Sequence, residues 1–239
     1  MELKIVRYVD RFINILVIIC LLPTILFSLY SIWDDNHIYN QADSSLFEMY
    51  RPDSKNSLSF EELKKINPEV FGWLTVKNTH IDYPLVQGEN NSKYVNTDVK
   101  GEFSLSGSIF LDCRNKNDFS NMNNIIYGHH MQKKMMFGEL DLYKEKKYFD
   151  KHLKGTIYFN NQHHKIQFFA FISVDAYDPL VYNPNLTYEN DGQNYLDYIK
   201  KKSINYKKID TTKKKTFIAL STCTSSSTNG RYVLVGYLK

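Results

Sequence analysis

The sequence predicts a mainly β fold, a closed or nearly closed eight-stranded barrel with a few helices, preceded by one transmembrane helix. Three observations support this prediction. After residue 70, short β-rich runs alternate with turn residues, and only two stretches there have helical periodicity. Before residue 34, one charge-free apolar segment is long enough to cross a bilayer. With 43% hydrophobic residues among 239, the chain can bury one sizeable core.

Residues 12–33 form this apolar segment and carry no charge. The flanking charges are Lys4, Arg7 and Arg11 before it and Asp34 and Asp35 after it. Because positive flanks stay in the cytoplasm, we expect residues 1–33 to be a cytoplasmic tip and anchor, with residues 34–239 outside the cell membrane. A cleavable signal peptide is the alternative, but the bulky residues of "SLYSIWDD" offer no small-residue cleavage site. The sequence therefore predicts a single-pass membrane protein.

The segment between the anchor and the barrel, residues 34–58, is expected to form a short helix and a linker through Arg51-Pro52. Ser59 and Glu62, three residues apart, form a capping box, which predicts that a second helix begins there. Asn67-Pro68 is expected to end that helix.

Eight β-rich runs separated by turn residues follow. They are residues 73–76, 81–86, 108–112, 124–129, 155–160, 165–176, 216–223 and 231–238. Two helical insertions are expected, at residues 135–152 and 188–203. In the second insertion, Tyr195, Leu196 and Ile199 fall on one helical face. Residues 59–239 are thus expected to form one barrel domain.

Composition narrows the classes of partner and cofactor. The net charge of +4 is small and no arginine-rich stripe carries interleaved aromatic residues, so we expect no nucleic-acid partner. Lysine clusters at 200–202 and 213–215 form either a solvated face or a contact surface for an anionic membrane or wall polymer. The three cysteines, Cys20, Cys113 and Cys223, are an odd number at scattered spacing, which predicts a free thiol. We expect no metal and no cofactor, since no CxxC pair is present.

Cys223 ends an apolar run and is followed by seven small or polar residues. A thiol at a strand end beside a polar loop is exposed, as a nucleophilic cysteine must be. A buried strand cysteine that packs as a small apolar residue explains the same position equally well. The position alone leaves both interpretations open.

Two histidines end another apolar run, "NNIIYGHHM", directly after Gly128, where the backbone can turn sharply. A strand-end histidine beside a strand-end cysteine is the arrangement that thiol catalysis requires. The other interpretations of His129 and His130 are surface residues, or a metal site with His163 and His164 that no carboxylate spacing supports.

Arg231 opens the last apolar run, shortly after Cys223. Its guanidinium keeps its charge and presents a fork of donors. Beside a thiolate it would stabilise the anion and donate to a carbonyl oxygen that becomes negative during acyl transfer. The alternative is a strand-edge arginine that faces solvent.

These positions carry a resemblance to a known family. "LSTC" at 220–223, with Arg231 on the next strand, resembles the Leu-x-Thr-Cys signature of sortases, the cysteine transpeptidases of Gram-positive bacteria. "IIYGHHM" resembles their strand-end catalytic histidine segment, and "GSIFLDCRN" at 107–115 resembles the run that precedes it in class B sortases. The anchor, the N-terminal helices and the helix near 188–203 are also similar to class B. The resemblance covers roughly residues 60–239 and implies a sortase-type catalytic barrel.

The resemblance implies a catalytic role for three residues. Cys223 would be the nucleophile, His129 the acid and base, and Arg231 the group that orients the substrate and stabilises the oxyanion. His130 stands where the family often has asparagine, so it is an alternative base or a substrate contact. Cys113 stands where the family often has an aromatic residue, and a packing role is expected for it.

Further site residues follow from the same resemblance. Ser221 and Thr222 flank the nucleophile and are expected to line the substrate groove. Asp112 is expected to orient the site from the preceding strand.

The implied reaction is cleavage of a C-terminal sorting motif of a secreted protein after Thr, through a thioacyl enzyme. The acyl group would then pass to an amino group of a peptidoglycan precursor or another amine acceptor. Two other interpretations stay open: an L,D-transpeptidase, whose His, Gly, Cys and Arg lie within a few adjacent positions, and a membrane-anchored, wall-binding β-domain with an inert Cys223. A papain-like protease is disfavoured, since its cysteine lies early in the chain and on a helix.

Overall fold

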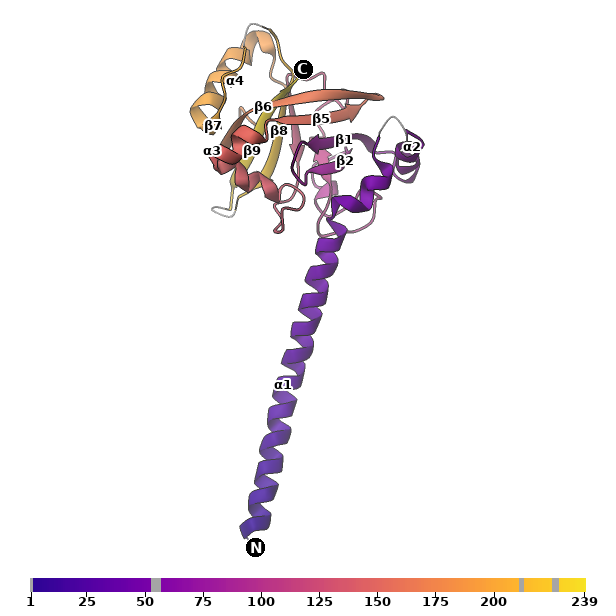
Figure 1. Cartoon of the computed structure of the whole chain (residues 1–239), viewed down its shortest axis with the longest axis vertical. Coiled ribbons are helices and arrows are strands. Elements are labelled where there is room, and N and C mark those ends of the chain that lie inside the picture. The colour runs from indigo at the N-terminus through magenta and orange to yellow at the C-terminus, as the bar shows by residue number, and fades with distance from the viewer. Residues whose placement is uncertain (1, 53–56, 211–212, 225–227) are drawn as a thin grey trace. The chain divides into compact units, whose positions relative to one another are not determined.

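The computed structural model describes residues 2–52, 57–210, 213–224 and 228–239 (Figure 1). These residues fall into two units, Met1–Asn40 and Gln41–Lys239.

The first unit consists of one helix, α1 (Glu2–Gln41). Among the described residues it is the helix that is long and apolar enough to cross a membrane, and none of its apolar window is buried. The Thr24 hydroxyl donates to the Leu21 carbonyl at 2.7 Å, and the Ser28 hydroxyl donates to the Thr24 carbonyl at 2.8 Å. Both hydroxyls therefore have hydrogen-bond partners within the helix, as a membrane interior requires. The helix continues to Gln41, so the short helix expected after residue 34 begins as a continuation of α1.

The second unit is a closed eight-stranded β-barrel, as predicted, with an additional ninth strand. Its neighbours run in the order β5-β1-β2-β3-β4-β8-β9-β6, and pairing of β5 with β6 closes the barrel. The strands are β1 (Val70–Val76), β2 (Asp82–Val86), β3 (Ile109–Leu111), β4 (Asn123–Tyr127), β5 (Lys154–Phe159), β6 (Gln162–Asp175), β7 (Ser203–Tyr206), β8 (Phe217–Cys223) and β9 (Gly230–Leu238). All eight predicted strands are confirmed, with ends that differ by three residues or fewer.

Three hydrophobic clusters hold the barrel and its helices together. The largest cluster includes strand residues such as Leu74, Phe168 and Leu220, all fully buried. A second cluster packs α4 (Tyr188–Lys202) against the outer face of the sheet through Tyr195, Leu196 and Ile199, the three residues predicted to share a face. A third cluster packs α2 (Ser57–Ile66) beside β1 and β2. Two short 3-10 helices, η1 (Ser44–Tyr50) and η2 (Lys93–Val95), lie in the N-terminal half of this unit.

One expectation about the elements is wrong, and one strand was not predicted. The helix expected at 135–152 is a 3-10 helix, η3 (Gly138–Lys144), followed by α3 (Lys146–Lys151), with Glu145 extended between them. Gly138 packs so closely on Met131 that a Cβ there would lie 1.7 Å from the Met131 carbonyl oxygen. β7 was not predicted, because its inward residue is the polar Asn205, whose amide donates to two backbone carbonyls at 2.8 and 2.9 Å.

Candidate active site

The register of the last hairpin brings the thiol and the guanidinium together. Cys223 ends β8 and lies directly opposite Arg231 of the antiparallel strand β9. Directly opposite residues project from the same face of a sheet, with their Cβ atoms about 4.5–5.5 Å apart. The Cys223 residue is exposed, as the nucleophile interpretation requires.

The parallel pairing of β4 with β8 brings the histidine to the same edge of the barrel. Tyr127 pairs with Ser221, and the Gly128 amide donates to the Ser221 carbonyl at 3.2 Å. His129 lies two residues beyond Tyr127, and Cys223 lies two residues beyond Ser221. Since side chains alternate with a period of two, both are expected on the same face.

Only glycine fits before this histidine. A Cβ on Gly128 would lie 2.5 Å from Ile109 Cδ1 and 2.8 Å from the Phe137 ring. Packing against Ile109 and Phe137 therefore favours glycine at the position before His129.

These strand ends border a groove of about 600 Å³. Five of the seven residues expected at the site line it: Ser221, Thr222, Cys223, His129 and Arg231. The structure therefore brings together thiol, imidazole and guanidinium in one open groove.

His129 is held by a hydrogen bond from its Nε2 to the Val95 carbonyl oxygen at 2.7 Å. Because a carbonyl oxygen only accepts, Nε2 must carry a hydrogen. This leaves Nδ1 as the nitrogen that can take up or release a proton. The contact thus selects both the tautomer and the ring orientation of His129.

His130 is engaged elsewhere. Its Nε2 lies 2.9 Å from an Asp141 carboxylate oxygen in η3, and it is not among the residues that line the groove. The structure therefore separates the adjacent histidines, with His129 at the groove and His130 paired with a carboxylate outside it.

Arg231 keeps most of its donors available. Its Nη1 donates to the Gly230 carbonyl at 2.9 Å, with a longer contact of 3.5 Å to Thr228. Neither Nε nor Nη2 has a partner among the described residues, and the side chain lines the groove. The hairpin therefore orients the guanidinium while leaving donors for a ligand.

Thr222 presents an unsatisfied hydroxyl to the site. The residue is 2% exposed, and its Oγ1 has no hydrogen-bond partner in the described part of the chain. A buried polar atom without a partner is costly unless a ligand satisfies it. This observation supports the expected role of Thr222 in binding substrate.

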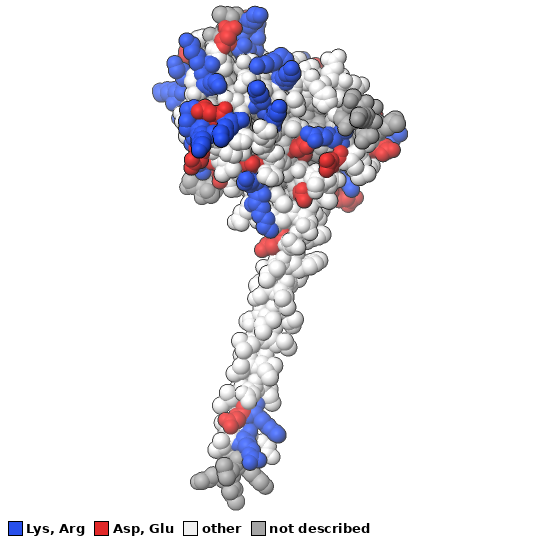
Figure 2. Space-filling view, in the orientation of Figure 1, with Lys and Arg blue, Asp and Glu red and all other residues white. Residues whose placement is uncertain are grey.

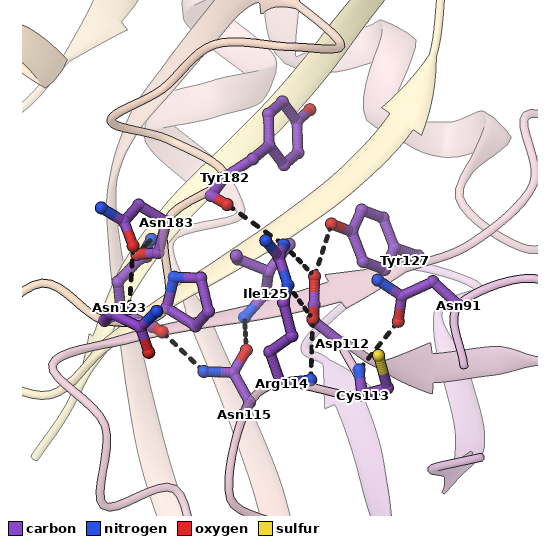
Figure 3. A network of polar contacts seen from close by, with 12 residues as sticks. Asn91, Asp112, Cys113, Arg114, Asn115, Asn123, Ile125, Tyr127, Tyr182 and Asn183 are labelled. Carbon is purple, nitrogen blue, oxygen red and sulfur yellow. Dashed lines mark hydrogen bonds and ion pairs between the residues drawn. The ribbon is translucent and has the colours of Figure 1, made fainter. Parts of the chain in front are cut away.

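Asp112 is fully buried, and Arg114 and Tyr127 hold its carboxylate (Figure 3). Arg114 donates to both of its carboxylate oxygens, from Nε at 2.8 Å and from Nη2 at 2.7 Å, and the Tyr127 hydroxyl donates at 2.9 Å. Burial alone would raise the pKa of Asp112, but these hydrogen bonds hold the pKa below its usual value. Asp112 therefore orients Arg114 and Tyr127, both of which line the groove.

Among the groove residues that were not singled out from the sequence, Arg114 and Tyr182 make the hydrogen bonds that bear most directly on the site. Arg114 lies within the quoted run "GSIFLDCRN", and Tyr182 lies in a loop that gives no signal. Arg114 Nη2 also donates to the Tyr182 carbonyl at 3.1 Å. Because the hydrogen bonds of Arg114 use only Nε and Nη2, its two Nη1 hydrogens have no partner among the described residues. The Tyr182 hydroxyl lies 2.8 Å from Ser221 Oγ, and burial raises the pKa of Tyr182 to about 12. Tyr182 therefore stays neutral and positions Ser221.

Cys113 contributes through its backbone. Its amide donates to the Asn91 side-chain oxygen at 2.8 Å, and Asn91 lines the groove (Figure 3). The Cys113 side chain is not among those lining the groove.

The hydrogen bonds to Asp112 are expected to stabilise the folded protein. Asp112→Asn in the full chain should lower the free energy of unfolding by about 1.5–3 kcal/mol at pH 7, because a buried charged acceptor is lost. A carboxyl with a lowered folded pKa stabilises above its unfolded pKa of about 3.9, and this stabilisation is lost as the pH falls through the folded pKa. The difference from wild type should therefore shrink in acid. Thermal unfolding monitored at several pH values tests this, with exposed Asp197→Asn as the control; a constant difference would contradict it.

A metal-ion requirement is not expected. Among the described residues no three His, Cys, Asp or Glu side chains converge as a metal site would require. Activity should therefore survive treatment with EDTA. Strong inhibition by EDTA that added Ca²⁺ or Zn²⁺ reverses would contradict this prediction.

Known proteins resemble this chain in sequence and in structure. No family model matches it. Sortase B of Staphylococcus aureus is 35% identical over 180 residues, which cover 74% of this chain and 72% of that protein. The chain belongs to the class B sortase family. It is therefore a sortase-type cysteine transpeptidase, and the alternatives of an L,D-transpeptidase or a binding domain without catalysis are not supported.

Solved sortase structures agree with this assignment. A Streptococcus pyogenes class B sortase involved in pilus biogenesis is 46% identical, with a TM-score of 0.70, over 77% of this chain and 99% of that one. The Staphylococcus aureus sortase B–substrate complex is 30% identical, with a TM-score of 0.72, over 86% of this chain and 97% of that one. The class B assignment made from the sequence is confirmed.

Proposed function

We propose that this sortase cleaves a C-terminal sorting motif of secreted proteins after Thr and transfers the new acyl end to an amine. The observation that carries the proposal is the convergence of Cys223, His129 and Arg231 on one groove from three strand ends. Such a set supplies the nucleophile, proton carrier and oxyanion donor that acyl transfer requires.

In the first half-reaction, the Cys223 thiol gives its proton to His129 Nδ1, and the resulting thiolate Sγ attacks the carbonyl carbon of the Thr residue. The carbonyl oxygen becomes an oxyanion that accepts hydrogen bonds from the free Arg231 donors. The carbon–nitrogen bond then breaks, and His129 Nδ1 gives its proton to the leaving amine. The product is a thioester on Cys223, and the cleaved C-terminal peptide is released.

In the second half-reaction, an amine attacks the thioester carbonyl. His129 Nδ1 takes a proton from that amine, the carbon–sulfur bond breaks, and Cys223 leaves as thiolate. A peptidoglycan precursor or another amine acceptor would supply the amino group. Water would complete hydrolysis in the same way.

The groove walls provide the substrate contacts in this proposal. The unpartnered Thr222 hydroxyl and Ser221 flank the nucleophile, and Arg114 offers two free Nη1 donors. Asp112 acts as a positioning residue through Arg114, and His130 plays no direct part, because it pairs with Asp141.

Arg114→Lys should raise KM by about tenfold with a smaller change in kcat, because a point charge keeps Asp112 neutralised but lacks the free guanidinium donors. Lys100→Arg, on an exposed loop, is the control and should change neither constant. Unchanged KM in Arg114→Lys would show that the Arg114 guanidinium does not contact substrate.

The location of the enzyme is part of the same proposal. Residues 1–33 would form the cytoplasmic tip and membrane anchor, residues 34–58 the connection, and residues 59–239 an extracellular catalytic domain. The apolar α1 and its basic N-terminal flank support this. An outward-facing groove would meet exported proteins and wall precursors.

A library of quenched fluorescent pentapeptides, incubated with the full chain in neutral detergent, tests the proposed reaction. We expect cleavage of a subset that shares a Thr, with the scissile bond after it, and transfer of the acyl fragment to an added amine. Cleavage at other bonds, or peptides cleaved equally by Cys223→Ala, would overturn the proposal.

A further inference from the structure

A second hollow, remote from the thiol, is lined by lysines. Its volume is about 500 Å³, and it is bordered by Lys77, Lys151, Lys154, Lys207 and Lys208. We call it the lysine groove. All five side chains are exposed, and in the described part of the chain none of them forms an ion pair with a carboxylate. Their charges are therefore available to a ligand.

The fold fixes the positions of these lysines. Lys77 follows β1, Lys154 begins β5, and Lys207 follows β7. The Lys77 amide donates to the Lys154 carbonyl at 2.9 Å, and the Lys207 amide donates to the Phe169 carbonyl at 2.7 Å. Three separate segments thus present ammonium groups around one hollow from hydrogen-bonded backbone positions. Lysines clustered on a single flexible loop would not be held in such fixed positions.

The local charge is strongly positive. Two carboxylates also line the groove, Asp150 and Asp210, so five lysines minus two acids leave a charge of +3. Asp150 is already paired with Lys146. The whole chain has 30 basic and 26 acidic residues, so the lining is much more strongly basic than the chain as a whole. Figure 2 shows Lys and Arg side chains gathered over the side of the barrel that carries α3, α4 and β7.

The lysine groove continues into a neighbouring hollow of about 420 Å³. The two share Lys77, Lys154 and Gln167, and the second adds Lys165 and Lys239. The positive lining therefore extends along the β5–β6 side of the barrel, which favours a chain-like ligand over a single small anion. Between the lysines, the lining offers the apolar Leu153 and the aromatic ring of Tyr237.

The strand register separates this region from the proposed catalytic groove. Tyr237 of the lysine groove pairs with Phe217, at the opposite end of the β8–β9 ladder from Cys223 and Arg231. Six residues along a strand span about 20 Å at about 3.3 Å per residue. A ligand in the lysine groove would therefore leave Cys223 free.

We propose that the lysine groove binds a linear phosphodiester polymer of the polyol phosphate type. Lysine ammonium groups bind phosphate as point charges without demanding one geometry, which suits a repeating, flexible polyanion. The concave shape fits a chain laid along it, whereas a membrane presents a plane. The lining has no arginine, its two phenylalanines, Phe168 and Phe169, are fully buried, and the Tyr237 ring is already faced by the Lys215 ammonium at 4.5 Å. It therefore lacks the open stacking platforms that nucleic-acid grooves use.

The test is binding of a dye-labelled glycerol phosphate oligomer to the full chain in neutral detergent, followed by fluorescence anisotropy. The variant is Lys77→Gln, Lys154→Gln and Lys207→Gln together. The matched control makes the same change of charge at three exposed lysines outside both hollows, Lys100, Lys116 and Lys201.

We expect the groove variant to weaken binding by about tenfold or more and to reduce the magnitude of the slope of log K against log salt by about 2, since three phosphate contacts are lost. The control triple should bind within about twofold of wild type, and peptide cleavage should be unchanged in both. Equal weakening in both triples, or no binding at about 150 mM salt, would overturn the proposal. Preference for single-stranded DNA or anionic vesicles over the oligomer would likewise overturn it in favour of that partner.

Discussion

His129→Ala is expected to lower kcat/KM by about 10²- to 10⁴-fold, the usual loss when an acid–base group is removed. The structure gives the reason for choosing this histidine over its neighbour. His129 lines the groove with Nδ1 as its free proton carrier, because Nε2 donates to the Val95 carbonyl. Steady-state cleavage of the selected fluorescent peptide measures the effect.

His130→Ala is the matched control, because it removes the same side chain one residue along. His130 is paired with Asp141 outside the groove, so its removal should cost much less activity. Circular dichroism of both variants checks that the barrel remains folded. A larger loss in His130→Ala than in His129→Ala would move the acid–base role to His130.

Arg231→Lys is expected to lower kcat/KM by about 10²-fold or more, comparable to the roughly 2.7–4 kcal/mol lost with an oxyanion donor. Lysine keeps the positive charge opposite Cys223 but cannot reproduce the fork of donors that Arg231 presents to the groove. Most of the loss should appear in kcat, because the oxyanion forms only in the transition state.

Alkylation of Cys223 provides the control for Arg231→Lys. The variant should still react with a thiol-specific reagent, and its thermal unfolding should match wild type, since Arg231 lies at the groove rather than in the core. Near-normal turnover in this variant would show that Arg231 is a strand residue without a catalytic role.

The barrel could be predicted from the sequence because its strands follow simple rules. Runs such as 216–223 and 231–238 are apolar, rich in β-branched and aromatic residues, and separated by turn residues. β7 was not predicted, because it has no hydrophobic pattern. Its position beside β6 is stabilised instead by the tertiary hydrogen bonds of Asn205. The division of residues 135–152 into η3 and α3 depends in the same way on close packing of Gly138 against Met131.

The site could be predicted only in part. Cys223, His129 and Arg231 stand at strand ends, where sequence position already implies a place at the barrel edge. The separate orientations of His129 and His130 could not be predicted, because they are set by Val95 and Asp141 from other segments. Tyr182 was missed for the same reason, since its hydroxyl contacts Ser221 of β8. Arg114 was missed although it lies only two residues after Asp112, which holds its guanidinium.

The formation of an acyl enzyme on Cys223 is the central claim, and intact-mass spectrometry tests it most directly. The full chain is mixed with its preferred peptide and quenched in acid. We predict a mass increase equal to the peptide fragment ending at Thr minus one water, removed by hydroxylamine. The adduct should persist in Cys20→Ala and Cys113→Ala and be absent in Cys223→Ala. Peptide cleavage that continues in Cys223→Ala, or an adduct on another residue, would contradict the account.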